Sequence, residues 1–90
     1  MKETLVELEW ESEAKAKFTQ MIHRIPLFHR SLAEHVVYKK AQLNAQERKA
    51  SQVEESDIVR AFFSEVPAAF YSLMIRLLEE VGFDYRKYES

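Results

Sequence analysis

The sequence predicts an all-α domain of four helices in which the second helix is long and central. One observation is compositional: the 90 residues include one glycine and two prolines, whereas all-β folds need more glycine for their turns. A second is periodic, because apolar side chains recur at helical spacing through most of the chain. A third is the position of the prolines, which stand between these periodic segments. Ninety residues make one domain, residues 1–90.

The first helix is expected over residues 13–24, with Ser12 as its N-cap. The residue before a proline is pushed out of the α region, so this helix should end before Pro26. Ahead of it, residues 1–11 are expected to form an extended arm or a frayed helix. Burial of Trp10, the only tryptophan, would hold that arm against the body. The predicted apolar stripe of the helix consists of Ala14, Phe18, Met21, Ile22 and Ile25.

The second helix is expected to be the longest, over residues 27–48, with Pro26 as its first residue. Asn44 is expected to mark fraying near its end, and Arg48 and Lys49 suit the negative pole of its C-terminus. The predicted apolar face consists of Leu27, Phe28, Leu32, Val36, Val37 and Leu43.

The last third of the chain is predicted to hold a short extended connector and two further helices. The connector is residues 51–53, the third helix is 54–65, and the fourth is 67–81 with Gly82 as its C′ residue. An aromatic tail over residues 83–88 is expected to fold back as a cap. The residues predicted to point inward are Ile58, Ala61, Phe62, Phe70, Leu73, Met74, Leu77, Leu78 and Val81.

Composition narrows the classes of function. The chain has no cysteine, which excludes disulfides and thiolate metal sites and favours a reducing compartment, so we predict a cytoplasmic location. The opening Met1-Lys2-Glu3 is not followed by the apolar core of a secretory signal. No apolar run approaches the roughly 20 residues that span a bilayer, so no membrane span is expected.

No group of side chains has the spacing of a catalytic or metal site. His23, His29 and His35 are six residues apart, so they do not share a helix face. No nucleophile has a recognisable base beside it, and one glycine cannot build a phosphate-binding loop. We therefore predict no catalytic residue, no metal and no cofactor, and a protein that is not an enzyme.

Charge is uneven along the chain, although the net charge is only −2. Residues 14–49 carry eight Lys and Arg against two Glu, and the segments on either side are acidic. Either the acidic ends pack beside the basic centre, or the centre offers a cationic face to an acidic partner. A nucleic-acid partner is the less favoured alternative, because the cations are spread around the helix and the pI is near 5.9.

Aromatic residues make up 12% of the chain and gather in its last third. They exceed what one helix face can hide, so the third and fourth helices are predicted to expose an apolar patch that a second copy or another protein covers. The predicted partner surface consists of His29, Phe63, Tyr71, Tyr85 and Tyr88.

Three segments together carry a family resemblance. They are Trp10 followed by Glu13-Ala14, the element Ile25-Pro26-Leu27-Phe28-His29-Arg30, and Val53-Glu54-Glu55-Ser56-Asp57-Ile58. In this order they resemble the small C-terminal domain of the B subunit of light-independent protochlorophyllide reductase, which also occurs as short stand-alone proteins. The resemblance covers about residues 8–63, and the helix and tail over residues 67–90 lie outside it. The glycine that follows the long helix in that family is missing here.

The resemblance implies a module that is not the catalytic part of the reductase and that packs beside its substrate region and partner subunit. The residues that match the family pattern are Trp10, Ile25, Pro26, Phe28 and Arg30. Pro26 is expected to set a corner, and Ile25 and Phe28 to fill the junction between the first two helices. Arg30 is expected to bond terminal carbonyls in preference to an acidic group.

The order helix, long helix, short connector, helix also resembles the histone fold. The favoured function is therefore a non-catalytic accessory domain that binds a protein partner or associates with itself, linked to tetrapyrrole or photosynthetic metabolism. One alternative is a histone-like DNA-binding dimer. Another is a tetrapyrrole-binding protein with His29 or His23 as axial ligand.

Overall fold

The computed structural model describes residues 7–88 and confirms an all-α domain of four helices with a long second helix. Of the arm predicted over residues 1–11, residues 1–6 lie outside the described residues, and the described part is extended because it contains a short strand. The elements in chain order are β1 (Glu9–Trp10), α1 (Ser12–Arg24), α2 (Leu27–Glu47), β2 (Gln52–Val53), α3 (Glu55–Glu65), the 3₁₀ turn η1 (Ala68–Phe70), α4 (Tyr71–Val81) and the 3₁₀ turn η2 (Tyr85–Tyr88).

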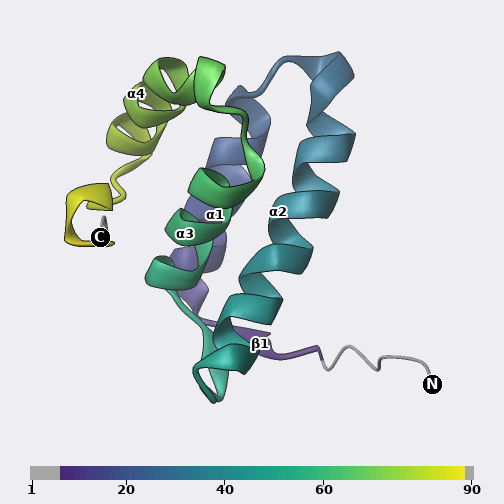
Figure 1. Ribbon diagram of the computed structural model, residues 1–90, viewed down its shortest axis with the longest axis vertical. Coiled ribbons are helices and arrows are strands. Elements are labelled where there is room, and N and C mark those ends of the chain that lie inside the picture. Colours follow the sequence, from purple (N-terminus) through teal and green to yellow (C-terminus); the bar gives the residue numbers. More distant parts are fainter. Residues whose placement is uncertain (1–6, 89–90) are drawn as a thin grey trace.

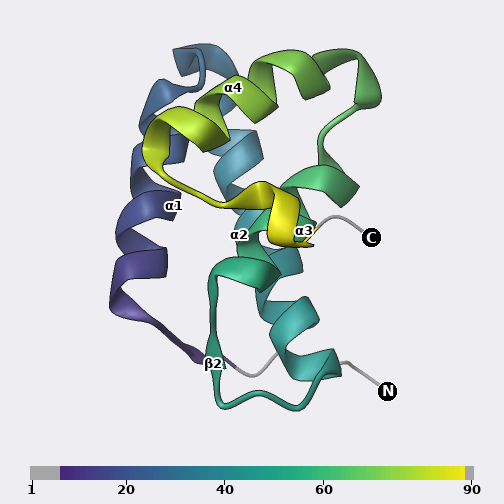
Figure 2. The same cartoon turned by 90° about the vertical axis from the view of Figure 1, so that its left-hand side faces the viewer.

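Helices α1, α2 and α3 run side by side and alternate in direction, and α4 lies across one end of them (Figures 1 and 2). At the opposite end, β1 pairs with β2 as a two-stranded parallel sheet, with Trp10 opposite Val53. The chain therefore has two distinct ends, one closed by the small sheet and one formed by the corner between α1 and α2 together with α4.

The N-cap of α1 is Glu11 and not Ser12. The Glu11 carboxylate accepts hydrogen bonds from the backbone N–H groups of Ala14 at 2.8 Å and Glu13 at 3.2 Å. Its own N–H donates to the carbonyl of Val53 at 2.9 Å. This bond to β2 keeps residue 11 extended, so the helix begins one residue earlier than predicted.

The corner between α1 and α2 consists of two extended residues, Ile25 and Pro26. Pro26 was predicted as the first residue of α2, but its ψ of 142° makes it the N-cap. Its carbonyl still accepts the first hydrogen bond of α2, from the N–H of His29 at 2.9 Å. The proline thus ends one helix and starts the next, as its missing N–H allows.

The end of α2 is tied down instead of frayed. Asn44 donates through Nδ2 to the Asp57 carbonyl at 3.0 Å, which links α2 to α3. Lys49 has a φ of 61°, and the next N–H, that of Ala50, bonds back to the Ala45 carbonyl at 2.9 Å. This is a Schellman-type end in which the left-handed position, usually glycine, holds a lysine.

Asp57 anchors the start of α3. Its side chain is fully buried and accepts from Arg48 Nε and Nη2, each at 2.8 Å, and from the N–H of Glu54 at 2.9 Å. Hydrogen bonding to Asp57 raises the pKa of the Arg48 guanidinium. The acidic first turn of α3 therefore caps the helix and also fastens it to α2.

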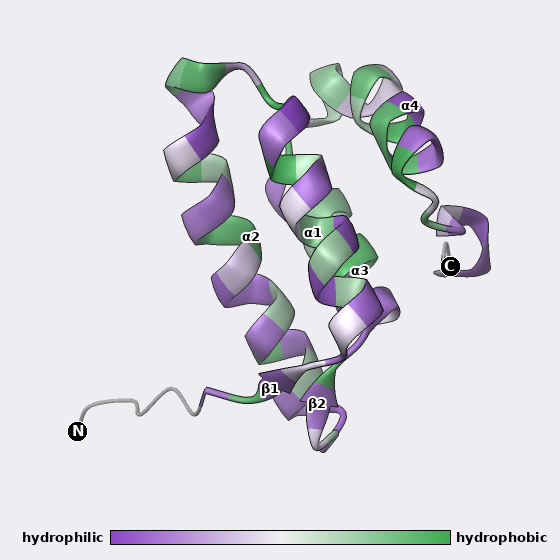
Figure 3. Ribbon diagram, turned by 180° about the vertical axis from the view of Figure 1, so that it is seen from behind, coloured by the Kyte–Doolittle hydropathy of each residue, from purple (hydrophilic) through white to green (hydrophobic). Residues whose placement is uncertain are grey.

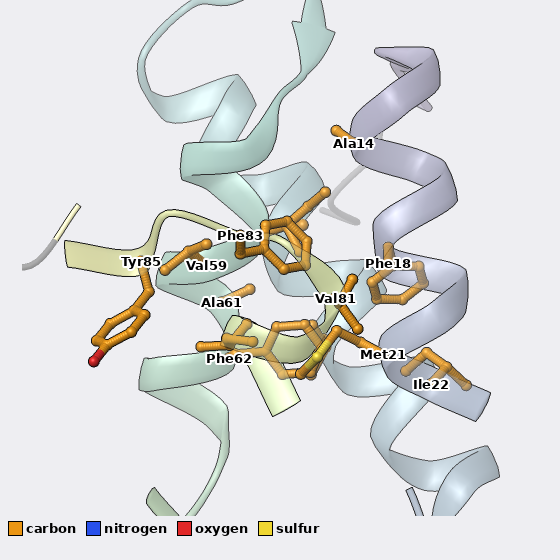
Figure 4. Packing of buried hydrophobic residues seen from close by; sticks show 14 of the residues in the cluster. Ala14, Phe18, Met21, Ile22, Val59, Ala61, Phe62, Val81, Phe83 and Tyr85 are labelled. Carbon is orange, nitrogen blue, oxygen red and sulfur yellow. The ribbon is translucent and has the colours of Figure 1, made fainter. Parts of the chain in front are cut away.

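The core lies between α1, α2 and α3, beneath α4 and the tail. Figure 4 shows Phe18 and Met21 from α1 and Phe62 from α3 meeting Val81 and Phe83. Gly82 ends α4 with a φ of 103°, as predicted for a C′ residue. The tail folds back as expected, because Phe83 and Tyr85 are both buried.

Candidate protein-interaction surface

Trp10 holds the N-terminal arm on the body. Its ring stacks on Tyr38 with centroids 4.8 Å apart and also contacts Phe18. Just before β1, the Leu8 N–H donates to the side chain of the buried Gln42 at 2.9 Å. This backbone N–H therefore has a hydrogen-bond partner within the chain. The arm is therefore fixed by a ring stack and a side-chain hydrogen bond.

Arg30 has the structural role that was preferred for it. Its Nη2 donates to the carbonyls of His23 at 2.9 Å and Ile25 at 3.0 Å, and its Nε donates to Ile25 at 3.3 Å. These carbonyls stand at the end of α1, where a helix leaves acceptors unpaired. Ile25 is half-buried against the core. The guanidinium thus holds the corner in one shape.

The prediction that Phe28 fills the junction between the first two helices is wrong. Its side chain is 83% exposed, and Leu27 and Leu32 are 74% and 68% exposed. All the buried residues of α2 lie from Val37 onward. The physical reason is length: α2 has 21 residues and α3 has 11, about 31 Å against 17 Å, so α3 covers only part of α2.

Two residues predicted to point inward from the fourth helix are also exposed. Phe70 is 57% and Leu73 is 46% exposed. The predicted helix is divided into η1 and α4, and the buried line of α4 passes through Met74, Leu78 and Val81. Phe70 and Leu73 stand on the flank of this line at the start of the helix, where no neighbouring element covers them.

The five large exposed apolar side chains of residues 7–88 form two groups, one at the start of α2 and one at η1 and the start of α4. The starts of α2 and α4 both lie at the end opposite the small sheet (Figures 1 and 2), and both are strongly apolar in Figure 3. We call this surface the apolar end. A fully exposed side chain of this kind has an area on the order of 150 Å², so the exposed apolar area of the five is on the order of 500 Å². Its members are Leu27, Phe28, Leu32, Phe70 and Leu73.

Most of the predicted aromatic partner surface is occupied within the chain. Phe63 packs edge-on against Tyr71, whose hydroxyl donates to the Phe63 carbonyl, and also contacts Tyr85. Tyr85 is buried and Tyr88 packs against the core. The prediction that these four aromatic side chains form a partner surface is corrected, because they pack within the chain. His29 alone of the five is exposed, with its ring 4.1 Å from that of Phe28, beside the apolar end.

Three cations of the basic middle form ion pairs with the acidic C-terminal segment, residues 50–90. Lys17 bonds to Glu55, Arg24 to Glu80 at 3.2 Å, and Arg48 to Asp57. Lys17 also donates to the Gly82 carbonyl at 3.1 Å. For these three cations, the interpretation that acidic segments pack beside the basic centre is therefore correct. Their charges are already paired within the chain and are less free to bind phosphate.

The titratable groups along the exposed half of α2 do not form a metal site. Within residues 7–88, no three His, Cys, Asp or Glu side chains converge on one point. Ser31, Glu34, His35 and Tyr38 line an open depression of about 330 Å³. Burial, together with the neighbouring Glu7 carboxylate, raises the pKa of the Tyr38 phenol, which donates to Glu7 at 3.1 Å.

Among the helices of residues 7–88, none alone has the length and apolar character to cross a bilayer. α3 and the segment Ala68–Val81 pass such a test only as a pair, and that pair is bent by 115°.

Comparison of the chain with protein-family models, with curated proteins and with solved structures finds no match.

The functional residues that sequence reasoning missed are the exposed members of the apolar end, which were predicted to be buried. One signal was present, because Leu32 and Val37 are five residues apart and so lie about 140° apart around a helix, too far for one buried stripe.

Proposed function

We propose that this chain is a non-catalytic protein-interaction domain, an accessory module that joins a protein assembly through its apolar end. The observation that carries the proposal is that five exposed Leu and Phe side chains belong to the starts of α2 and α4, which both lie at the end opposite the small sheet. An apolar patch of several hundred Å² is costly to leave in water and commonly marks a contact surface.

The family resemblance supports the same surface. Of the residues that carry it, Ile25 and Arg30 have partners inside the chain, whereas Phe28 has its ring in solvent. Phe28 stands three residues after Ile25, in the same short element. An aromatic anchor of this kind is typical of the centre of protein interfaces. By the resemblance, the assembly that this domain joins belongs to tetrapyrrole metabolism.

Site-specific photocrosslinking tests the proposal. A chain with benzoylphenylalanine at position 28 is irradiated in cells of the native host, and the adducts are identified by mass spectrometry. We expect a discrete protein adduct that does not form with the probe at position 47, an exposed residue at the far end of α2. The same adduct should form between the two purified proteins. An identical pattern from both positions, or no adduct at all, would refute the proposal.

A further inference from the structure

The apolar end is divided between two helices that the chain itself does not bring into contact over these residues. One group, Leu27, Phe28 and Leu32, belongs to the start of α2, and the other, Phe70 and Leu73, belongs to η1 and the start of α4. Both groups lie at the same end of the molecule (Figures 1 and 2). A surface of this kind can pair with itself, because a two-fold axis through that end sets each α2 against the α4 of the other copy.

The unpaired charges beside the two groups have opposite signs. Glu34 on α2 and Arg76 on α4 are both exposed, and within residues 7–88 neither makes an ion pair. Glu34 stands seven residues, about two helical turns or 10 Å, after Leu27. Arg76 stands three residues, about one helical turn, after Leu73.

The surroundings of Glu34 suit an arginine. Glu34 lines the depression of about 330 Å³ together with the Ser31 hydroxyl, the His35 imidazole and the Tyr38 phenol, all of which have acceptor atoms. A guanidinium has five donors and no acceptor, so it can use several of these groups at once. Tyr38 is held in place by its stack on Trp10, so this wall of the depression is fixed before anything binds.

We propose that the apolar end binds a second copy of this chain, with α2 of each protomer packed on α4 of the other and Glu34 of each facing Arg76 of the other. This inference rests on the proposed function and identifies the binding partner of the apolar end as a second copy of the chain. The apolar area supports it: on the order of 500 Å² per copy is a large part of the roughly 800 Å² per partner of a standard interface.

Charge reversal with rescue tests the dimer. Sedimentation equilibrium of the purified full chain, from about 1 to 500 µM, should show reversible dimers. Glu34→Arg and Arg76→Glu should each raise the dissociation constant by about tenfold or more. The double variant should restore it to within about threefold, which loss of folding cannot imitate. The matched control pair is Glu47→Arg and Arg60→Glu, both exposed and outside the apolar end, and it should leave the constant unchanged.

Several outcomes would overturn the dimer. A clean monomer at every concentration would do so, and so would single reversals without effect or a double variant no better than the singles. If the purified chain is monomeric while the probe at position 28 still captures a different protein, the dimer fails and the proposed function stands. If neither assay finds a contact, both fail.

Discussion

Lys49 occupies a backbone position at which glycine should be more stable than a residue with a Cβ. Its φ of 61° lies in the left-handed region, where a Cβ crowds the following carbonyl at a cost of about 1–2 kcal/mol. Glycine avoids that cost but loses about 0.5–1 kcal/mol through its freedom in the unfolded chain. The free energy of unfolding of Lys49→Gly should therefore exceed that of Lys49→Ala by about 0.5–1 kcal/mol. For a domain of this size, that corresponds to a difference of about 2–8 °C in Tm.

The control for this prediction is Lys49→Ala. Both variants remove the same positive charge from the C-terminus of α2, which is worth about 0.3–1 kcal/mol, so the comparison of Gly with Ala isolates the Cβ. Chemical denaturation followed by circular dichroism measures both free energies of unfolding, provided that the transition is two-state. If the glycine variant is no more stable than the alanine variant, the strain assigned to Lys49 is absent and the reasoning fails.

Three further predictions follow from the same geometry. Phe28→Ser should change the free energy of unfolding of the monomer by less than about 0.5 kcal/mol, whereas Phe62→Ala should lower it by about 3–5 kcal/mol. Denaturation at low protein concentration measures both values, and equal losses would contradict the exposure of Phe28. Asp57→Asn should lower the free energy of unfolding by about 2–4 kcal/mol, because the Arg48 guanidinium and the Glu54 N–H lose a buried carboxylate acceptor. Glu47→Gln is the control, and an Asp57→Asn variant as stable as this control would show that Asp57 does not anchor α3. Because the pKa of Tyr38 is raised in the folded state, its protonated form contributes stability that is present below about pH 10 and lost as the pH rises through the folded pKa; Tyr38→Phe should remove that part of the alkaline loss in a pH series.

Sequence reasoning predicted the helices because their signals are local. The pre-proline position of Ile25 ended α1, and Gly82 ended α4, where the structure has a left-handed residue. The end of α2 was harder, because a lysine occupies the position where glycine would have been the signal. Pairing of β1 with β2, which moved the cap of α1 to Glu11, depends on residues some 40 positions apart and has no local signature.

The candidate surface could not be predicted, because it depends on which apolar residues lack a neighbour. Periodicity shows that Phe28, Leu32 and Leu73 are apolar members of helices, but not how far the adjoining helix extends. The short α3 leaves the first turns of α2 uncovered, and the break at η1 shifts the start of α4. Conversely, Tyr71 and Tyr85 were predicted as exposed because their packing against Phe63 joins separate elements.

The element that carries the family resemblance has two kinds of residue, and this division supports a binding role. Pro26 and Arg30 fix the corner: one sets the backbone of the turn, and the other bonds the free carbonyls of α1. Phe28 lies between them and contributes almost nothing to the core. A rigid support under an exposed ring lowers the entropy lost on binding, since the backbone is already ordered before contact. The corner therefore has the rigidity that the proposed contact surface requires.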